Sequence, residues 1–413
     1  MPATAPVFPL RPAFPNGDDP ETFQIDAVNS LIRKAAYFTI FTVPDASRPN
    51  VPIFSPDGQM IGVEVNEELH RFDIRSAMPQ PGEGIRVSNQ VGEPIANVHI
   101  RWMPCPDDFE GAPGKTPPPT PLDPTRSQRF IMLDGSMRFR DRDESGFLAF
   151  GAGRTLPMLV DGAPQLGIGS VIETLEGFGK LRGLEGTNIV NGYINPPNGL
   201  VLSFMLRFSD PCQRLLASRE ISPIEPIQHP APETVILAFL GETDRDTGTL
   251  NLSPDGRVLG YSLVERLRLV HISFDTQTRH GMRSSLIEGP VVGSFCYTSH
   301  FNPLDPRPLF PIYTTRGSLQ FFDSQGRVTG GIHVNIEEGR AFRTELPGVP
   351  MPVFRLGGLG PLGAGFGQFA GATGMMTLNA CVSAFPPTRS SMYELRINDR
   401  DGRFRASFRD AWM

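Results

Sequence analysis

The sequence is poor in the features that mark disulfide-rich, metal-binding and helical proteins. Its 413 residues include only four cysteines (Cys105, Cys212, Cys296 and Cys381), and these are far apart in sequence. Their spacing indicates neither a disulfide framework nor a zinc-binding motif. Only residues 25–34 resemble a helix. These absences exclude several classes of protein but do not identify one.

Excess positive charge is also lacking. The net charge is −6, and no basic stripe is present that could neutralise the phosphates of a nucleic acid. No apolar run has the length needed to cross a bilayer, and residues 1–20 lack the basic start and apolar centre of a secretory signal. We therefore expect a soluble, cytoplasmic monomer or homodimer with no nucleic-acid partner and no membrane span.

Linear catalytic motifs are missing as well. The sequence has no Gly-x-Ser-x-Gly, His-Glu-x-x-His or P-loop pattern, so hydrolase, zinc-protease and kinase functions lack support. Two glycine-rich runs are present, but an alternating strand follows each of them instead of the helix that a dinucleotide site requires. We predict no cofactor.

What the sequence does contain is an internal duplication. The run Gly177-Phe178-Gly179, continued by Gly183, Gly186 and Asn191, recurs 188 positions later as Gly365-Phe366-Gly367, Gly371, Gly374 and Asn379. The Ser-Pro-Asp-Gly turn at 55–58 returns at 253–256, and further matches keep the same order. The long period favours two homologous domains, each with its own core.

The composition favours β structure. Glycine (43) and proline (42) are abundant and separate short apolar runs such as 35–43 and 235–240, as is typical of an all-β chain with many turns. We predict two tandem homologous antiparallel β-barrels of about eight strands each, packed as a pseudo-symmetric pair. The predicted units are a proline-rich segment (1–20), a first barrel (21–210) with a surface insertion (104–120), a linker (211–232) and a second barrel (233–413).

The repeated pattern Gly-x-Gly-x-(Leu/Phe)-x-Gly-x-x-Gly resembles the signature of the allene oxide cyclase and dirigent-like (calycin-type) barrels. It covers about 40 residues in each copy. The resemblance implies a barrel that encloses an apolar ligand and guides its cyclisation or coupling mainly through shape. Because only structural glycines match, the family's catalytic residues are not transferred. In both copies the glycines also fit a simpler role at tight barrel corners.

Polar residues that coincide in the two copies are the first candidates for a site. Asn191 and Asn379 occupy the same place on strands, where they could bind a substrate oxygen or close a backbone turn. Arg154 and Arg340 also coincide; they could hold a carboxylate or oxyanion, or pair structurally with Asp141 and Asp323. Glutamates 173, 176 and 185 flank the first glycine run, and a buried one could act as a proton donor.

Residues found in only one copy are the second group. His333 and Asn335 share one strand face, while Cys296, Thr298 and His300 share another, so the histidines could form an acid–base pair or bind a metal. No third ligand has suitable spacing, and we predict no metal site. The catalytic candidates are His333, His300, Asn335, Arg340 and Arg154; the substrate-binding candidates are Asn191, Tyr193, Asn379, Tyr297, Tyr313, Phe366 and Phe178.

Together these patterns predict a cofactor-independent cyclase or isomerase that holds a hydrophobic, natural-product-like molecule in a barrel cavity and guides ring closure or isomerisation. Divergence of the polar residues indicates that one copy is active and the other mainly structural. Two alternatives remain open at this point: a non-catalytic, lipocalin-like carrier of a hydrophobic ligand, and a histidine-dependent metalloenzyme.

Overall fold

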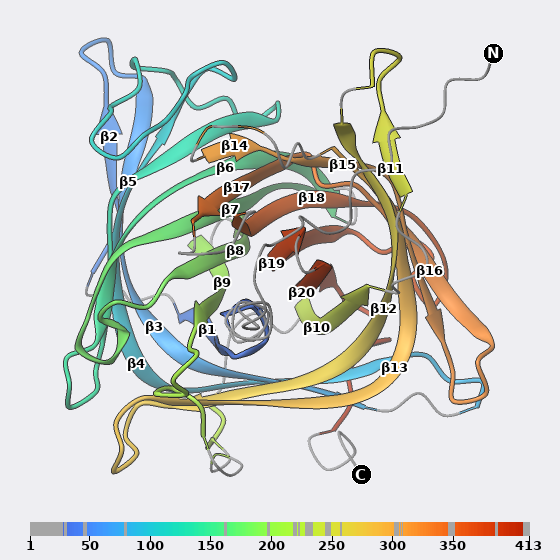
Figure 1. Ribbon diagram of the computed structural model, residues 1–413. Helices are drawn as coiled ribbons and strands as arrows, with labels where there is room; N and C mark the ends of the chain where they lie inside the picture. The colour runs from blue at the N-terminus through green and yellow to red at the C-terminus, as the bar shows by residue number, and fades with distance from the viewer. Residues whose placement is uncertain are drawn as a thin grey trace, which may run out of the picture.

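The structure is a computed structural model in which nearly every described residue belongs to a β-strand or a connecting turn (Figure 1). It describes residues 28, 31–43, 48–77, 81–160, 163–195, 199–217, 221, 224–227, 234–243, 249–256, 258–300, 305, 307, 309–345, 352–384 and 387–407. The prediction of an all-β chain is confirmed. The proline-rich segment at 1–20 lies outside the described residues.

Among the described residues, nine strands form the first half of the chain and eleven form the second. The first half comprises β1 (Ala35–Val43), β2 (Val51–Phe54), β3 (Met60–Ala77), β4 (Arg86–Pro104), β5 (Gln128–Phe139), β6 (Gly146–Val160), β7 (Ala163–Phe178), β8 (Gly186–Asn195) and β9 (Gly199–Ser209). The second comprises β10 (Thr234–Thr243), β11 (Thr249–Leu252), β12 (Val258–Asp275), β13 (Arg283–His300), β14 (Leu309–Pro311), β15 (Tyr313–Phe322), β16 (Val328–Val334), β17 (Glu338–Thr344), β18 (Val353–Gly367), β19 (Gly374–Ala384) and β20 (Pro387–Asn398).

All of these strands pair antiparallel, and the sheet closes on itself. In the first half the pairings run from β1 through β3, β4, β5, β6, β7, β8 and β9 back to β1. In the second half they run from β10 through β12, β13, β15, β16, β18, β19 and β20 back to β10. A single pairing, between Ile74 and Ile272, joins β3 to β12.

The long hairpins β3–β4 and β12–β13 each reach beyond their own half. The end of the second-half hairpin places Phe274 and Met282 in the core of the first half, where the ring of Phe274 lies 5.3 Å from that of Phe38. In Figure 1 the two hairpins run in opposite directions along the lower edge of the molecule. The first half therefore lacks a complete core of its own.

The first-half hairpin makes the reciprocal contact. Its residues Ile74, Ile85 and Val87 lie in the core that contains Phe369 and Phe404 of the second half. The side-chain amide of Gln368 donates a hydrogen bond of 2.7 Å to the carbonyl of Ile85. The two cores are separate clusters, one mostly of first-half and one mostly of second-half residues, and the apolar end of each hairpin adds residues to the core of the other half.

The segments that follow β9 and β20 are exchanged in the same way. Residues 404–406, after β20, bond to the backbone of Val87 in the first half, and residues 215–217, after β9, bond to the backbone of Ser284 in the second half. Leu215 is also part of the first core. The segment at 211–232, expected to be an extended spacer, is therefore anchored at its start; much of the remainder lies outside the described residues.

The structure can be compared with the local predictions for strands, the helix and the glycine turns. The run 35–43 is a strand with the predicted bounds, and no strand forms within 105–127, around the predicted insertion. Of the predicted helix at 25–34, residues 28 and 31–33 are helical, and the other residues before Lys34 are not described. The repeated glycines occupy matching turns: φ is +59° at Gly179 and +58° at Gly367, a conformation that favours glycine.

The exchanged hairpins predict that a second-half residue stabilises the first half. Phe274→Ala is expected to cost about 3–5 kcal/mol, because it removes a buried aromatic ring and leaves a cavity. Amide hydrogen exchange measures the effect, as lost protection in β1, β5 and β9. Val291→Ala, at an exposed position of β13, is the control and should change little. If Phe274→Ala left amide protection in the first half unaltered, the burial of the second-half hairpin in the first core would be contradicted.

Candidate functional site

Two buried glutamates, one in each half, lie on strand positions flanked by core residues. Glu67 lies on β3 between the core residues Val65 and Leu69, and Glu265 lies on β12 between Leu263 and Leu267. The two glutamates are 198 positions apart, which is also the distance between the Ser-Pro-Asp-Gly turns. They therefore occupy the same position in the duplicated fold.

Glu265 is the centre of a polar network inside the second half. One carboxylate oxygen accepts hydrogen bonds from the hydroxyl of Tyr297 at 2.8 Å and of Ser391 at 3.4 Å, and pairs with Nε of Arg389 at 2.7 Å. The other accepts from the hydroxyl of Tyr393 at 2.8 Å. Glu265 is fully buried, so these donors replace the water that its charge would otherwise bind.

A glycine makes room for this network. A Cβ atom at Gly241 of β10 would lie 2.2 Å from Oε2 of Glu265 and 2.7 Å from the ring of Tyr393. Burial raises the pKa of both Tyr297 and Tyr393 above the usual range. Both phenols therefore stay protonated near neutral pH and can donate hydrogen bonds.

The first half has apolar residues where the second half has this network. The strand registers place Ile100 at the position of Tyr297, Phe204 at that of Tyr393 and Leu202 at that of Ser391. Only the glutamate is kept. The two halves therefore share an architecture but not an interior chemistry.

Glu67 is consequently in a very different environment. Its Oε1 accepts one hydrogen bond of 3.2 Å from the amide of Asn50, and its buried Oε2 has no hydrogen-bond partner among the described residues. Burial raises its pKa to about 7. Near neutral pH, Glu67 is thus partly protonated, unlike an ordinary surface glutamate.

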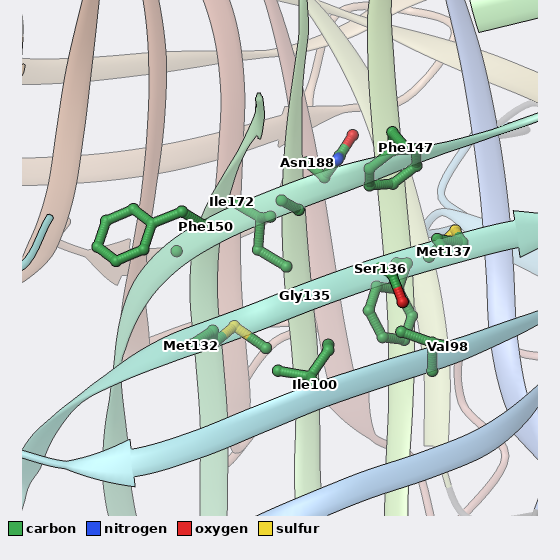
Figure 2. A pocket seen from close by; sticks show the side chains of 13 residues that line it. Val98, Ile100, Met132, Gly135, Ser136, Met137, Phe147, Phe150, Ile172 and Asn188 are labelled. Carbon is green, nitrogen blue, oxygen red and sulfur yellow. The ribbon is translucent and has the colours of Figure 1, made fainter. Parts of the chain in front are cut away.

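Beside this strand, the interior of the first half is closely packed. A cavity of about 20 Å³ lies between strands β4 to β9, with Ile100, Met132, Phe147 and Ile172 among its lining residues (Figure 2). Such a volume holds about one water molecule. This cavity is too small for the hydrophobic molecule that the predicted cyclase would hold.

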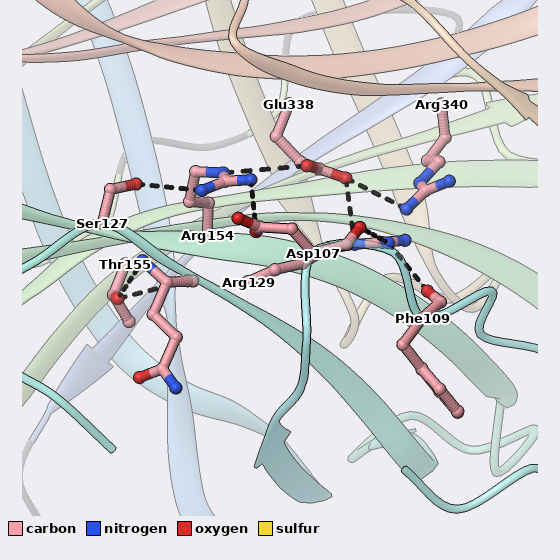
Figure 3. A network of polar contacts seen from close by, with 9 residues as sticks. Asp107, Phe109, Ser127, Arg129, Arg154, Thr155, Glu338 and Arg340 are labelled. Carbon is pink, nitrogen blue, oxygen red and sulfur yellow. Dashed lines mark hydrogen bonds and ion pairs between the residues drawn. The ribbon is translucent and has the colours of Figure 1, made fainter. Parts of the chain in front are cut away.

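The matched arginines Arg154 and Arg340 lie together at the junction of the halves (Figure 3). Both pair with Glu338, at 3.8 Å and 3.1 Å, and Arg129 approaches the same carboxylate at 3.6 Å. Arg154 also bonds to Asp107 at 2.8 Å. The structure thus places these arginines in ion pairs, as the structural alternative proposed, although the partners are not Asp141 and Asp323.

The matched asparagines also lie between the halves and not in an interior cavity. The amide of Asn191 donates to the carbonyl of Met375 at 3.1 Å, and that of Asn379 donates to the carbonyl of Thr187 at 2.6 Å. Arg396 donates to Oδ1 of Asn191 at 3.0 Å and lies over the ring of Tyr193. Each asparagine therefore joins one half to the backbone of the other.

The remaining candidates are scattered. His333 and Asn335 are exposed and Cys296 lies on the outer face of β13, whereas His300 stacks on the exposed Tyr313 and contacts Thr315 at 2.9 Å. Phe366 is exposed, and Phe178 is half-buried beside Arg138. Of the predicted site residues, Tyr297 is the one that contacts the Glu265 network. The two histidines do not share a site with it.

Acidic residues near the first glycine run also serve the junction. Glu173 pairs with Arg355 of the second half at 3.1 Å, and Glu185 pairs with it at 3.4 Å. Burial raises the pKa of Glu173 despite this partner. Within the described part of the chain, no group of three metal-binding side chains comes together, and no helix is long and apolar enough to span a membrane.

Comparison with known proteins adds no identification: no family model, curated protein or solved structure matches this sequence. The resemblance to allene oxide cyclase and dirigent-like barrels therefore remains a prediction.

The sequence analysis missed Glu67, Glu265, Arg389 and Tyr393. A usable signal existed: the 198-residue shift of the Ser-Pro-Asp-Gly turn, carried forward, aligns Glu67 with Glu265. Both interrupt the apolar face of an alternating strand. Arg389 and Tyr393 carry no such signal, because the first half has unrelated residues at their positions.

The two glutamates should respond oppositely to neutralisation. The raised pKa of Glu67 means that the folded state binds more protons than the unfolded state between pH 4.5 and about 7. Its contribution to stability therefore falls by about 3 kcal/mol as pH rises through that window. Urea unfolding of Glu67→Gln should show a flatter pH dependence than the wild type and greater stability at pH 8.

Glu265→Gln is the matched comparison. It leaves Arg389 buried beside a neutral partner, so it should lower the free energy of unfolding by about 3–5 kcal/mol throughout this pH range. A Glu67→Gln variant as destabilised as Glu265→Gln at pH 8 would contradict the assigned environments.

Proposed function

We propose that the chain forms two eight-stranded barrels related by a pseudo-twofold axis, and that the second barrel is a cofactor-independent isomerase or cyclase acting on an apolar molecule that carries an oxygen function. The axis is supported by the pairing of Ile74 with Ile272, residues that are also 198 positions apart. An antiparallel strand pair in which a residue faces its own counterpart lies on such an axis.

The observation that carries the catalytic proposal is the Glu265 network itself. A buried charge surrounded by hydroxyl donors reduces stability relative to an apolar core unless it is fully compensated, and the first half manages without these donors at the same positions. Strongly perturbed groups concentrated in one place are typical of functional sites. We therefore infer that the catalytic site lies in the second barrel, around Glu265.

The network supplies the groups that a proton-transfer isomerisation needs. Glu265 is the base that accepts a proton from the carbon next to a carbonyl and returns it to another carbon of the same molecule. Tyr297 and Tyr393 turn their hydroxyl groups from Glu265 to the substrate oxygen, where they stabilise the enolate that forms. Arg389, 2.7 Å from the carboxylate, holds Glu265 in place through an ion pair. The proton count balances without a cofactor.

The second candidate is a carrier that binds a hydrophobic ligand among the apolar residues of the second half without transforming it. The two candidates differ in a measurable way. A carrier binds an apolar ketone but leaves its hydrogens unchanged, whereas the isomerase exchanges the hydrogens next to the carbonyl with solvent. The histidine-dependent metalloenzyme has no support in the arrangement of His300 and His333, which have separate partners.

Small apolar ketones, with acetophenone as the first probe, test the proposal in D₂O. Proton NMR should show protein-dependent exchange of the methyl hydrogens. Glu265→Gln should abolish this exchange, and Tyr393→Phe should slow it by about 10²-fold through loss of one donor. Glu67→Gln, the matched change in the other half, should leave it intact. Binding by saturation-transfer NMR without exchange would establish the carrier instead, and neither binding nor exchange would reject both.

A further inference from the structure

A cavity outside the Glu265 network lies in a groove at the junction of the halves. Its volume is about 320 Å³, within the size range of small-molecule sites. It is bounded by residues 87–91 of β4, the first residues of β10, Ile227 and the tail residues 405–406, with the rings of Phe41 and Phe72 forming part of its wall. It is distinct from the Glu265 network.

The groove is a built feature and not a gap between loose segments. The side chain of Asn89 accepts a hydrogen bond of 2.7 Å from the backbone of Ile236 and donates one of 2.9 Å to it, which fixes β4 against β10. The backbone of Ile227 donates to Val91 at 2.8 Å, and that of Ala406 donates to Val87 at 2.9 Å. Three separate parts of the chain are thus tied to one strand around the groove.

Apolar groups form much of the wall, and a few polar groups mark specific points. Gln90 is 8% exposed, and its buried Oε1 has no hydrogen-bond partner among the described residues. An unpaired amide oxygen costs free energy in a folded protein unless a ligand or water satisfies it. Its presence in the groove therefore points to an occupant with a polar group.

The groove also has a positively charged edge. Arg405 lines it, and Arg86 donates a hydrogen bond of 2.7 Å to the neighbouring Arg403 carbonyl. Asp399, the acid that pairs with Arg405 at 3.6 Å, is itself fully buried. An anionic group at this edge would complement the surplus of arginines.

We propose that this groove binds an amphipathic carboxylate: a free molecule with an apolar body of drug-like size, whose carboxylate pairs with Arg405 and whose body lies against Phe41, Phe72 and Val91. A further polar group of the ligand satisfies the Gln90 amide. The site joins the tail of the second half to the first half. Occupancy consequently stabilises the contact between the halves, since a ligand that binds only the folded state stabilises it.

Dodecanoate, below its micelle concentration, is the probe, and dodecyltrimethylammonium is the matched ligand with the same tail and the opposite charge. Isothermal titration calorimetry on the full chain should detect saturable binding of dodecanoate and at least tenfold weaker binding of the cation. Arg405→Gln should weaken dodecanoate binding about tenfold, and Val91→Trp should abolish it by filling the groove. Arg214→Gln, on the other exchanged tail, should leave binding unchanged.

Photolabelling of the wild-type protein tests the site without relying on variants that could fail to fold. A dodecanoate analogue with a terminal diazirine should label peptides that contain residues 87–91 or 226–227 on irradiation. Labelling confined to other peptides, equal binding of the two ligands, or no saturable dodecanoate binding would overturn the proposal. The Glu265 variants separate this site from the proposed catalytic one, because Glu265→Gln should bind dodecanoate like the wild type.

Discussion

Burial of each hairpin end in the opposite half is the constraint on which the rest of this structure depends. Apolar residues at the far end of β12–β13 complete the first core, and those of β3–β4 complete the second. The tails that follow β9 and β20 repeat the exchange through backbone hydrogen bonds. Because the exchanged surfaces are apolar, exposing them in a separated half would cost hydrophobic free energy. We therefore expect the duplicated chain to fold as one unit.

Because the hairpin ends and the junction maintain the architecture, the residues around Glu67 and Glu265 can differ between the two halves. The architecture is maintained by the exchanged elements and by the asparagines and arginines between the halves. Glu67 and Glu265 show how far the interiors have diverged: one has a single hydrogen bond and a raised pKa, and the other is surrounded by tyrosines, a serine and an arginine. Environment, and not residue type, assigns different chemistry to the same carboxylate.

Sequence patterns predicted the local structure better than the site. Alternation and turn residues identified β1 and the unpaired stretch near 104–120, because strand periodicity and Pro/Gly chemistry are local properties. They could not show that Phe274 packs on Phe38, since strand exchange depends on tertiary packing. For the same reason, residues such as Asn191 and Arg340, chosen because both copies keep them, lie at the junction: a duplicated fold preserves the contacts that hold its halves together.

Differential scanning calorimetry of the intact chain tests the shared-core account most directly, because cooperativity measures whether the two halves unfold together. The account predicts one transition whose calorimetric and van't Hoff enthalpies agree, with no separate melting of either half. Two resolved transitions, or a calorimetric enthalpy about twice the van't Hoff value, would show that the halves are independent domains and would contradict it.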